Sequence, residues 1–169
     1  MSDIEALLRD VMTRALGDLE QQGMDVYTFS FYLDHESRAV SVCADTRESS
    51  ARLVGRSNAF ANRYFLGAVR DGDLETAALW QANVGRSLSL GDFAAVNVAR
   101  TELGRHRPTP DLCLAMVESV IENHDAIRKL SSDPAQTILT CSTLDDEVGL
   151  VWSLPSEAPR GSIGGRVPE

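Results

Sequence analysis

The chain has 169 residues, of which 43% are hydrophobic. This length favours one domain, and this composition argues against global disorder. The net charge of −9 disfavours nucleic acid and anionic membranes as partners, because like charges repel, and it favours a protein partner with a basic surface.

The start of the chain is acidic and amphipathic, unlike the basic segment and apolar block of a secretory signal. No apolar run approaches the roughly 20 residues that span a bilayer. We therefore expect a cytoplasmic protein. Cys43, Cys113 and Cys141 lie far apart within apolar segments and form no CxxC pair, so we expect buried, reduced thiols.

Apolar residues recur at helical spacing from Ile4 to Leu19 and predict an amphipathic helix over residues 3–22. Ser2 and Glu5 are typical of a capping box at its start. Gly23 is a favourable residue for its end.

Residues 26–33 are rich in β-branched and aromatic side chains and predict a strand. One face of that strand carries Tyr27, Phe29, Phe31 and Leu33. A polar turn separates it from a second predicted strand at residues 39–44, so the pair is expected to form an antiparallel hairpin.

A second capping pattern at residues 45–48 predicts a helix that reaches about Phe65. The expected buried face consists of Leu53, Ser57, Phe60, Ala61, Tyr64 and Phe65. The opposite face carries the arginine stripe Arg52, Arg56, Arg63 and Arg70.

Residues 66–107 have the weakest pattern. Residues 74–83 are consistent with a short helix in which Trp80 packs inward. Residues 93–99 fit either a strand or a helix, and periodicity alone does not decide between them.

Thr109 and Pro110 predict the start of another helix, which extends to about Leu130. Residues 136–143 and 149–154 are two further predicted strands, joined by an acidic loop. Residues 155–169 are rich in Pro, Gly and Ser and predict a disordered C-terminal tail.

Two hairpins separated by helices predict an α+β fold with a mainly antiparallel sheet built from those hairpins and helices packed against it. Residues 1–154 are expected to form the single globular domain.

No motif points to a metal or a cofactor. The histidines His35, His106 and His124 lack ligand spacing, and the chain has neither a nucleophile elbow nor a phosphate-binding glycine loop in the right context. We therefore expect neither group. A thiol–imidazole pair, such as Cys43 with His35 or Cys113 with His124, stays open as the basis of a hydrolase-like enzyme with a dispersed site.

Charged residues supply the remaining candidates. The acids in the two hairpin turns are candidates for contact with a basic partner, namely Asp34, Glu36, Asp145, Asp146 and Glu147. The stripe residues Arg52, Arg56 and Arg63 are candidates for binding a phosphate or carboxylate, which would make the chain an adaptor for an anionic ligand. A solvated surface is the alternative reading of both groups.

The aromatic strand at residues 26–34, the capped helix after the second strand, the central Trp80 and the long helix before the final hairpin together resemble the bacterial domain-of-unknown-function family 4303. The resemblance covers about residues 3–154. Members are often small stand-alone proteins, and some resemble immunity proteins encoded beside polymorphic toxins. The resemblance therefore implies a non-catalytic immunity protein that neutralises a cognate bacterial toxin by direct binding, and it supplies no catalytic residues. The oligomeric state is left open.

Overall fold

The structure is a computed structural model that describes residues 3–155 of the chain. The helices are α1 (Asp3–Gln21), α2 (Arg47–Arg70), α3 (Leu74–Ala78), α4 (Pro110–Glu122) and α5 (His124–Lys129). The strands are β1 (Thr28–Asp34), β2 (Ala39–Asp45), β3 (Ala95–Glu102), β4 (Ile138–Cys141) and β5 (Leu150–Ser153). Two short 3-10 turns are η1 (Leu90–Asp92) and η2 (Pro134–Gln136).

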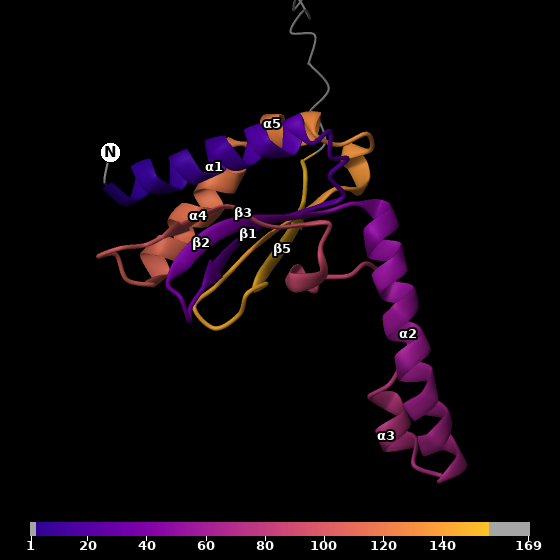
Figure 1. Cartoon of the computed structure of the whole chain (residues 1–169). Helices are drawn as coiled ribbons and strands as arrows, with labels where there is room; N and C mark the ends of the chain where they lie inside the picture. The colour runs from indigo at the N-terminus through magenta and orange to yellow at the C-terminus, as the bar shows by residue number, and fades with distance from the viewer. Residues whose placement is uncertain (1–2, 156–169) are drawn as a thin grey trace, which may run out of the picture.

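The strands form one sheet with the order β3-β2-β1-β4-β5, and helices pack on it, which confirms the α+β class (Figure 1). The expectation of a mainly antiparallel sheet was wrong, because β1 and β4 pair in parallel and the sheet is mixed. The reason is the path of the chain. After β3, α4 and α5 bring it back to the end where β1 begins, and there the Val26 N–H donates to the Leu130 carbonyl at 2.9 Å. β4 therefore starts beside β1 and runs in the same direction.

The segment that periodicity left undecided contains β3, which pairs antiparallel with β2. The register shifts twice along this pair. Asn97 and Ala99 lie at φ angles of 57° and 52°, in the left-handed region. Such backbone at a register shift is typical of β-bulges, which bend and twist an edge strand.

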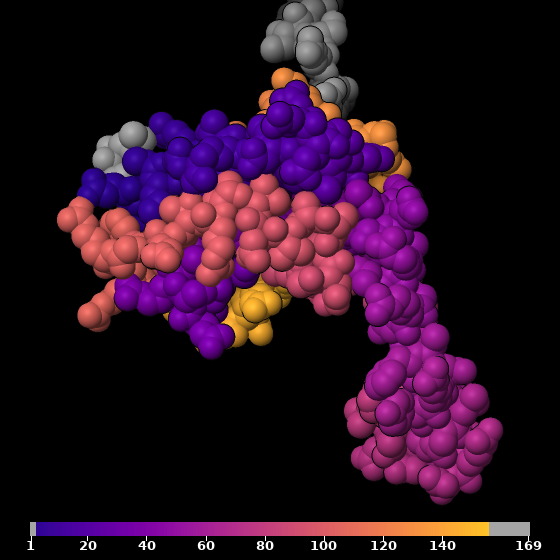
Figure 2. Space-filling model, viewed as in Figure 1, coloured from indigo at the N-terminus to yellow at the C-terminus, as the bar shows by residue number. Residues whose placement is uncertain are grey.

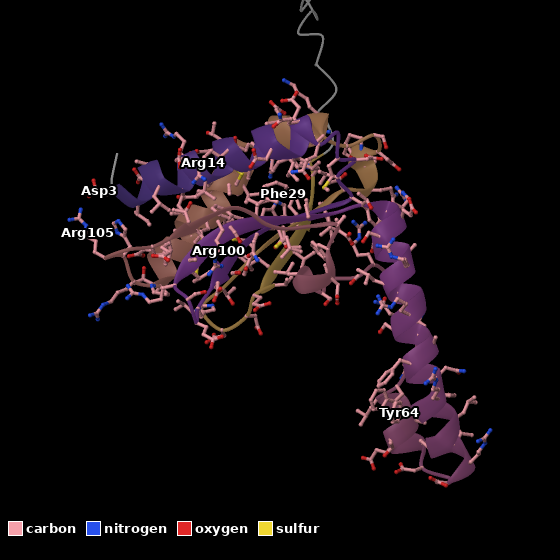
Figure 3. All side chains as sticks on the ribbon, viewed as in Figure 1. Asp3, Arg14, Phe29, Tyr64, Arg100 and Arg105 are labelled. Carbon is pink, nitrogen blue, oxygen red and sulfur yellow. The ribbon has the colours of Figure 1, made fainter. Side chains whose placement is uncertain are left out.

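One face of the sheet carries the main hydrophobic core, beneath α1 and α4 (Figures 1 and 3). Phe29, Phe31 and Leu33 of β1 are fully buried there, as the alternating pattern predicts. α1 matches the predicted first helix within one residue, although Ser2 of its capping box lies outside the described residues. Arg14 of α1 also donates a hydrogen bond to Thr101 Oγ1 of β3 at 2.7 Å.

The second face of the sheet has a smaller cover. Tyr32 and Cys43 project from it and pack with Leu90 and Phe93, which belong to η1 and the residue after it. Val148, from the connection between β4 and β5, adds to this cluster. The segment that contains Leu90 and Phe93 therefore covers this face of the sheet. The residues between β2 and this segment do not pack on the sheet face.

α2 is the helix predicted after the second strand, but its expected buried face is not buried. Along its 24 residues, all of them described, the buried side chains are Ser49, Ser50 and Ala68. The helix leaves the end of the sheet at Asp45 and projects away from the body, so most of its apolar residues have no core beside them (Figures 1 and 2). Helical periodicity in the sequence identifies an apolar face. Whether other parts of the protein cover that face depends on the path of the chain in three dimensions.

Most of the remaining predicted elements are close to those observed, but the short helix predicted over residues 74–83 ends at Ala78 as α3. Thr109 accepts a hydrogen bond from Leu112 N at the start of α4, as a cap residue should. The predicted single helix is broken at Asn123 into α4 and α5. Within residues 3–155 no helix is long and apolar enough to cross a bilayer. The prediction of a disordered tail concerns residues almost all of which lie outside the described range.

Replacing Phe29 with Ala tests where the stability of the fold resides. The side chain is fully buried, so the change should lower the free energy of unfolding by about 3–5 kcal/mol, through lost burial and a residual cavity. The matched control is Phe60→Ala in α2, where the ring is half exposed and contacts Tyr64 and Trp80. This change should cost less, about 1–2 kcal/mol. Urea unfolding measures both, and equal losses would contradict the division into core and projecting helix.

Candidate functional site

α2, α3 and the extended residues 79–89 form a projection, here called the arm, that stands clear of the sheet and its helices (Figure 2). Thr46 caps α2, and its Oγ1 accepts a hydrogen bond from Ser49 N. The first turn of α2 is also tied to the returning chain, because Ser87 N donates to Ser50 Oγ at 2.9 Å. The two chain segments of the arm are thus tied to each other at its base.

Three aromatic rings hold the arm together near its outer half. Tyr64 and Trp80 stack, with ring centroids 4.6 Å apart and an angle of 22° between the planes. Phe60 lies 4.9 Å from Tyr64 and 6.1 Å from Trp80. Offset and edge-to-face aromatic pairs of this kind each add about 0.5–1.5 kcal/mol to the burial of their area. Trp80 therefore packs on α2, and the expectation that it packs inward holds only within the arm.

The same arm presents a large apolar surface to solvent. Phe60 is 52% exposed and Tyr64 is 48% exposed. Leu74, Leu79 and Val84 are 72%, 79% and 99% exposed. Single exposed apolar side chains are ordinary, but a contiguous group on one projection is typical of a surface that binds another molecule. Figure 3 shows Tyr64 in this outer region, far from the core residue Phe29.

Hydrogen bonds fix the returning segment against α2. Asn58 Nδ2 donates to the Asn83 carbonyl at 3.0 Å, and Asn83 N donates to Asn58 Oδ1 at 2.8 Å. The Asn83 side chain also accepts from Gly85 N at 2.7 Å. These bonds satisfy the extended backbone where no strand partner is present. The exposed apolar side chains therefore stand on an ordered support.

Arg86 fastens the end of the arm to the sheet. Its guanidinium donates to the backbone carbonyls of Tyr27 and Gln136, both at 2.6 Å. It also lies 3.6 Å from the centre of the Tyr27 ring, while Arg47 lies 4.6 Å from that centre. Burial lowers the pKa of Arg86 from its usual range, but guanidinium groups stay charged in proteins. Two charge-assisted bonds and a cation–π contact thus hold the base of the arm.

A groove of about 700 Å³ lies at the base of the arm. α2 contributes apolar and arginine side chains to its wall, including Leu53, Arg56 and Phe60, and the returning chain contributes Leu88 and Asp92. This groove opens beside the aromatic cluster, so the apolar surface of the arm continues into a concave part near the body.

The arginine stripe follows the exposed sides of α2. Arg56 lines the groove, and Arg52 donates to Ser49 Oγ at 3.4 Å. Within the part of the chain that the structure describes, Arg52, Arg56 and Arg63 form no ion pair with a carboxylate. They border the apolar surface of the arm, and whether they bind an anionic ligand stays a prediction.

The five predicted contact acids lie together at the end of the sheet opposite the arm. β1 and β4 are parallel neighbours, so the turns that follow them emerge at the same end. His35 Nε2 lies 3.2 Å from the Thr143 carbonyl and links the two turns. We call this group the acidic end, and its members are Asp34, Glu36, Asp145, Asp146 and Glu147. All except Asp34 are exposed.

Asp34 has a structural role within the acidic end. Its carboxylate accepts hydrogen bonds from the hydroxyl and the backbone N–H of Ser37, and it pairs with Arg100 at 3.0 Å. The Ser37 bonds, with Arg100 adding to them, lower the pKa of Asp34 to about 2. Asp34 therefore closes the β1–β2 turn, and the free carboxylates of the acidic end belong to the other four residues.

The thiols and imidazoles are not assembled into a reactive pair. Burial raises the pKa of Cys43 to about 11 and that of Cys141 to about 12, and it also raises the pKa of Cys113. His124 lies beside Trp152, whose indole N–H donates to Nε2 at 3.3 Å. Across residues 3–155 no hydrogen bond joins a cysteine to a histidine, and no group of three potential ligands is placed to hold a metal.

Sequence reasoning assigned the arm aromatics to the core, placed Tyr27 on the apolar face of a strand and did not single out Arg86, although Tyr27 lies just before β1 and carries Arg86 and Arg47 against its ring. One signal was present, since the expected buried face of α2 also contains Ser57 and is bordered by Arg56 and Arg63. That mixture of aromatic residues and arginine is more typical of an interface than of a core.

The fold and these surfaces define an α+β protein with a projecting helical arm. Comparisons of this chain with family models, with curated proteins and with solved structures find no match. The resemblance to family 4303 therefore stays a prediction, and the proposals below depend on the molecule's own surfaces.

Replacing Arg86 with Ala should loosen the base of the arm. Two hydrogen bonds from a charged donor to backbone carbonyls are lost, so the free energy of unfolding should fall by about 1–3 kcal/mol. Amide hydrogen exchange in residues 83–90 should accelerate, because the returning chain loses its attachment. Arg86→Lys should restore only part of the protection, since lysine lacks the planar fork. Arg56→Ala is the matched control on the same arm, and equal exchange in both Ala variants would contradict the role of Arg86.

The three thiols should be unreactive in the folded protein. With a pKa of about 11, Cys43 has a thiolate fraction of roughly 10⁻³ at pH 8, so a thiol reagent should label the protein rapidly only after unfolding. An unfolded thiol ionises near a pKa of about 8.5. The stability that comes from burying the neutral thiols is therefore fully present below about pH 8.5. It is lost as the pH rises toward 11, because the unfolded thiols ionise before Cys43 does in the folded protein. Rapid labelling of one native cysteine at pH 7 would instead favour a nucleophile.

Proposed function

We propose that this chain is a non-catalytic protein-binding module that works through two surfaces, the arm and the acidic end. The observation that carries the proposal is the arm itself. Its apolar side chains lie outside the core, and leaving such area in water forgoes about 25 cal/mol per Å² of stabilisation. A second protein surface would recover that free energy.

The composition of the arm supports a protein contact. Tyr64 and Trp80 belong to the residue types most enriched at interface positions that dominate binding, and so does arginine, represented by Arg56 and Arg63. The arginine stems can cover apolar surface while the guanidinium groups stay in water or pair with carboxylates. The stripe thus fits the rim of a protein interface as well as it fits an isolated anion site.

The order of the arm supports the same function. The paired bonds between Asn58 and Asn83 and the attachment through Arg86 hold the surface in one arrangement before any partner arrives. A preorganised surface loses less conformational entropy on association, so more of the contact energy appears as affinity.

The narrower form of the proposal is an immunity protein that neutralises a cognate bacterial toxin by direct binding. Its support is the acidic end, where two turns far apart in the sequence place their carboxylates together, in a chain whose net charge is −9. Such a field accelerates the encounter with a basic partner and weakens as salt is added.

The alternative of a hydrolase-like enzyme has less support. Its candidate pairs, Cys43 with His35 and Cys113 with His124, are not hydrogen-bonded within the described residues, and the raised pKa values of the thiols oppose thiolate formation.

Site-specific photo-crosslinking in the producing cell tests the proposal. A benzoyl-phenylalanine at Tyr64 should yield adducts with a protein chain, whereas the same residue at Gln21, exposed on α1, is the matched control and should not. Absence of any protein adduct at Tyr64 would overturn the arm as a contact surface.

The same probe at Glu36 should capture a basic protein whose binding weakens with salt. A neutral or acidic partner there would overturn the immunity form.

A further inference from the structure

Charge is distributed unevenly along the arm. Helix α2 carries five arginines and one glutamate, a net charge of +4 in a chain of net charge −9. Near the base, Arg52 and Arg56 are basic positions on its exposed side. At the tip, the three acids Asp71, Asp73 and Glu75 around the start of α3 outnumber the single Arg70. The arm therefore runs from a basic base to an acidic tip.

This gradient matches a second copy of itself when the two arms lie antiparallel. A helix of 24 residues is about 36 Å long, and a two-fold axis across its middle places the tip of each arm beside the base of the other. With that axis at Phe60, Asp71 of each copy lies opposite Ser49 of the other, about one helical turn from Arg52. An isologous pair needs the same patch to be complementary to itself, and the arm has this property.

The exposed side of α2 also has a spacing suited to helix pairing. Leu53, Phe60 and Gly67 recur every seven residues, and Tyr64 lies one turn after Phe60 on the same side. Phe60 and Tyr64 are exposed, whereas Leu53 and Gly67 are half-buried. With the two-fold axis at Phe60, Leu53 of one copy lies opposite Gly67 of the other. Nothing lies within 4 Å of the place where a Cβ of Gly67 would be, so there is open space for the leucine. Arg56 then lies opposite Tyr64, in a position for a cation–π contact.

The ends of the arm are complementary in shape as well. The base carries the groove lined by Leu53, Phe60 and Leu88, and the tip carries the exposed leucines Leu74 and Leu79. In an antiparallel pair, the apolar tip of each copy lies beside the groove of the other copy. A single two-fold axis therefore accounts for the groove, the tip and the charge gradient together when the partner is a second copy of this chain.

We propose that two copies of this chain pair through their arms, antiparallel, about a two-fold axis near Phe60. The proposal rests on the proposed function in that it names the partner of the arm. Two strips about 36 Å long and 10 Å wide bury roughly 700 Å² in total. This area is below the range of stable interfaces and fits a weak, concentration-dependent dimer. The acidic ends lie at the far side of each body and stay accessible to a basic partner.

Charge reversal on the full chain tests the pairing, with sedimentation velocity at several concentrations as the measurement. Arg52→Glu and Asp71→Arg should each weaken the dimer at least 10-fold, and the double variant should return to within about 3-fold of the original. Arg52 lies on α2 and Asp71 directly follows it. The two residues are 19 positions apart, about 28 Å along the helix axis, so they cannot contact each other within one chain. Recovery in the double variant therefore requires the arm of a second copy.

Disulfide trapping gives an independent readout. Phe60→Cys, at the proposed axis, should form an intermolecular disulfide under mild oxidation. Leu66→Cys is the control, because Leu66 is similarly exposed but lies on another side of α2. The three native cysteines are buried and contribute little background. Circular dichroism verifies that each variant remains folded.

The outcomes separate this proposal from the proposed function. Concentration-dependent dimers, weakened by each single variant and restored by the double variant, support antiparallel pairing. A chain that stays monomeric at about 100 µM, or a double variant no better than the singles, overturns it. In that case adducts of Tyr64 with a different protein would still support the arm as a protein-binding surface, whereas no adduct would reject both.

Discussion

The parallel pairing of β1 with β4 is the constraint on which the arrangement of the surfaces depends. Because α4 and α5 return the chain to the end of the sheet where β1 starts, the turns after both strands emerge together at the opposite end. Those turns carry the acidic end, including Glu36 and Asp145. β2 runs the other way, so α2 leaves from the end where β4 begins. The parallel pairing of β1 with β4 and its antiparallel pairing with β2 thus place the acidic end and the arm at opposite ends of the molecule.

The arm is stable without a core of its own because its supports are local. Tyr64 and Trp80 stack at its outer half, Asn58 and Asn83 exchange hydrogen bonds along its length, and Arg86 attaches its base. These contacts order the backbone but leave apolar area in water. The apolar residues of the arm therefore differ from those of β1, which are fully buried in the core.

The two surfaces suit different kinds of recognition. Apolar area on an ordered support contributes affinity, whereas exposed carboxylates contribute encounter rate and selectivity between partners. If the arms pair, each dimer presents two acidic ends, and a basic partner can be bound at both. The buried thiols, with raised pKa values, take part in neither surface and belong to the packing of the sheet.

The sequence by itself determined the local elements. Repeating apolar positions defined α1, alternation defined β1, and Thr109 with Pro110 defined the start of α4, because each signal depends on neighbouring residues alone. The sequence also identified the acids of the acidic end as candidates for partner contact, but it did not predict that the two turns would lie side by side. Only the tertiary structure decided that β4 joins β1 in parallel and that Phe60 faces solvent. Both depend on where distant segments lie, and periodicity specifies the face of an element without specifying what packs against it.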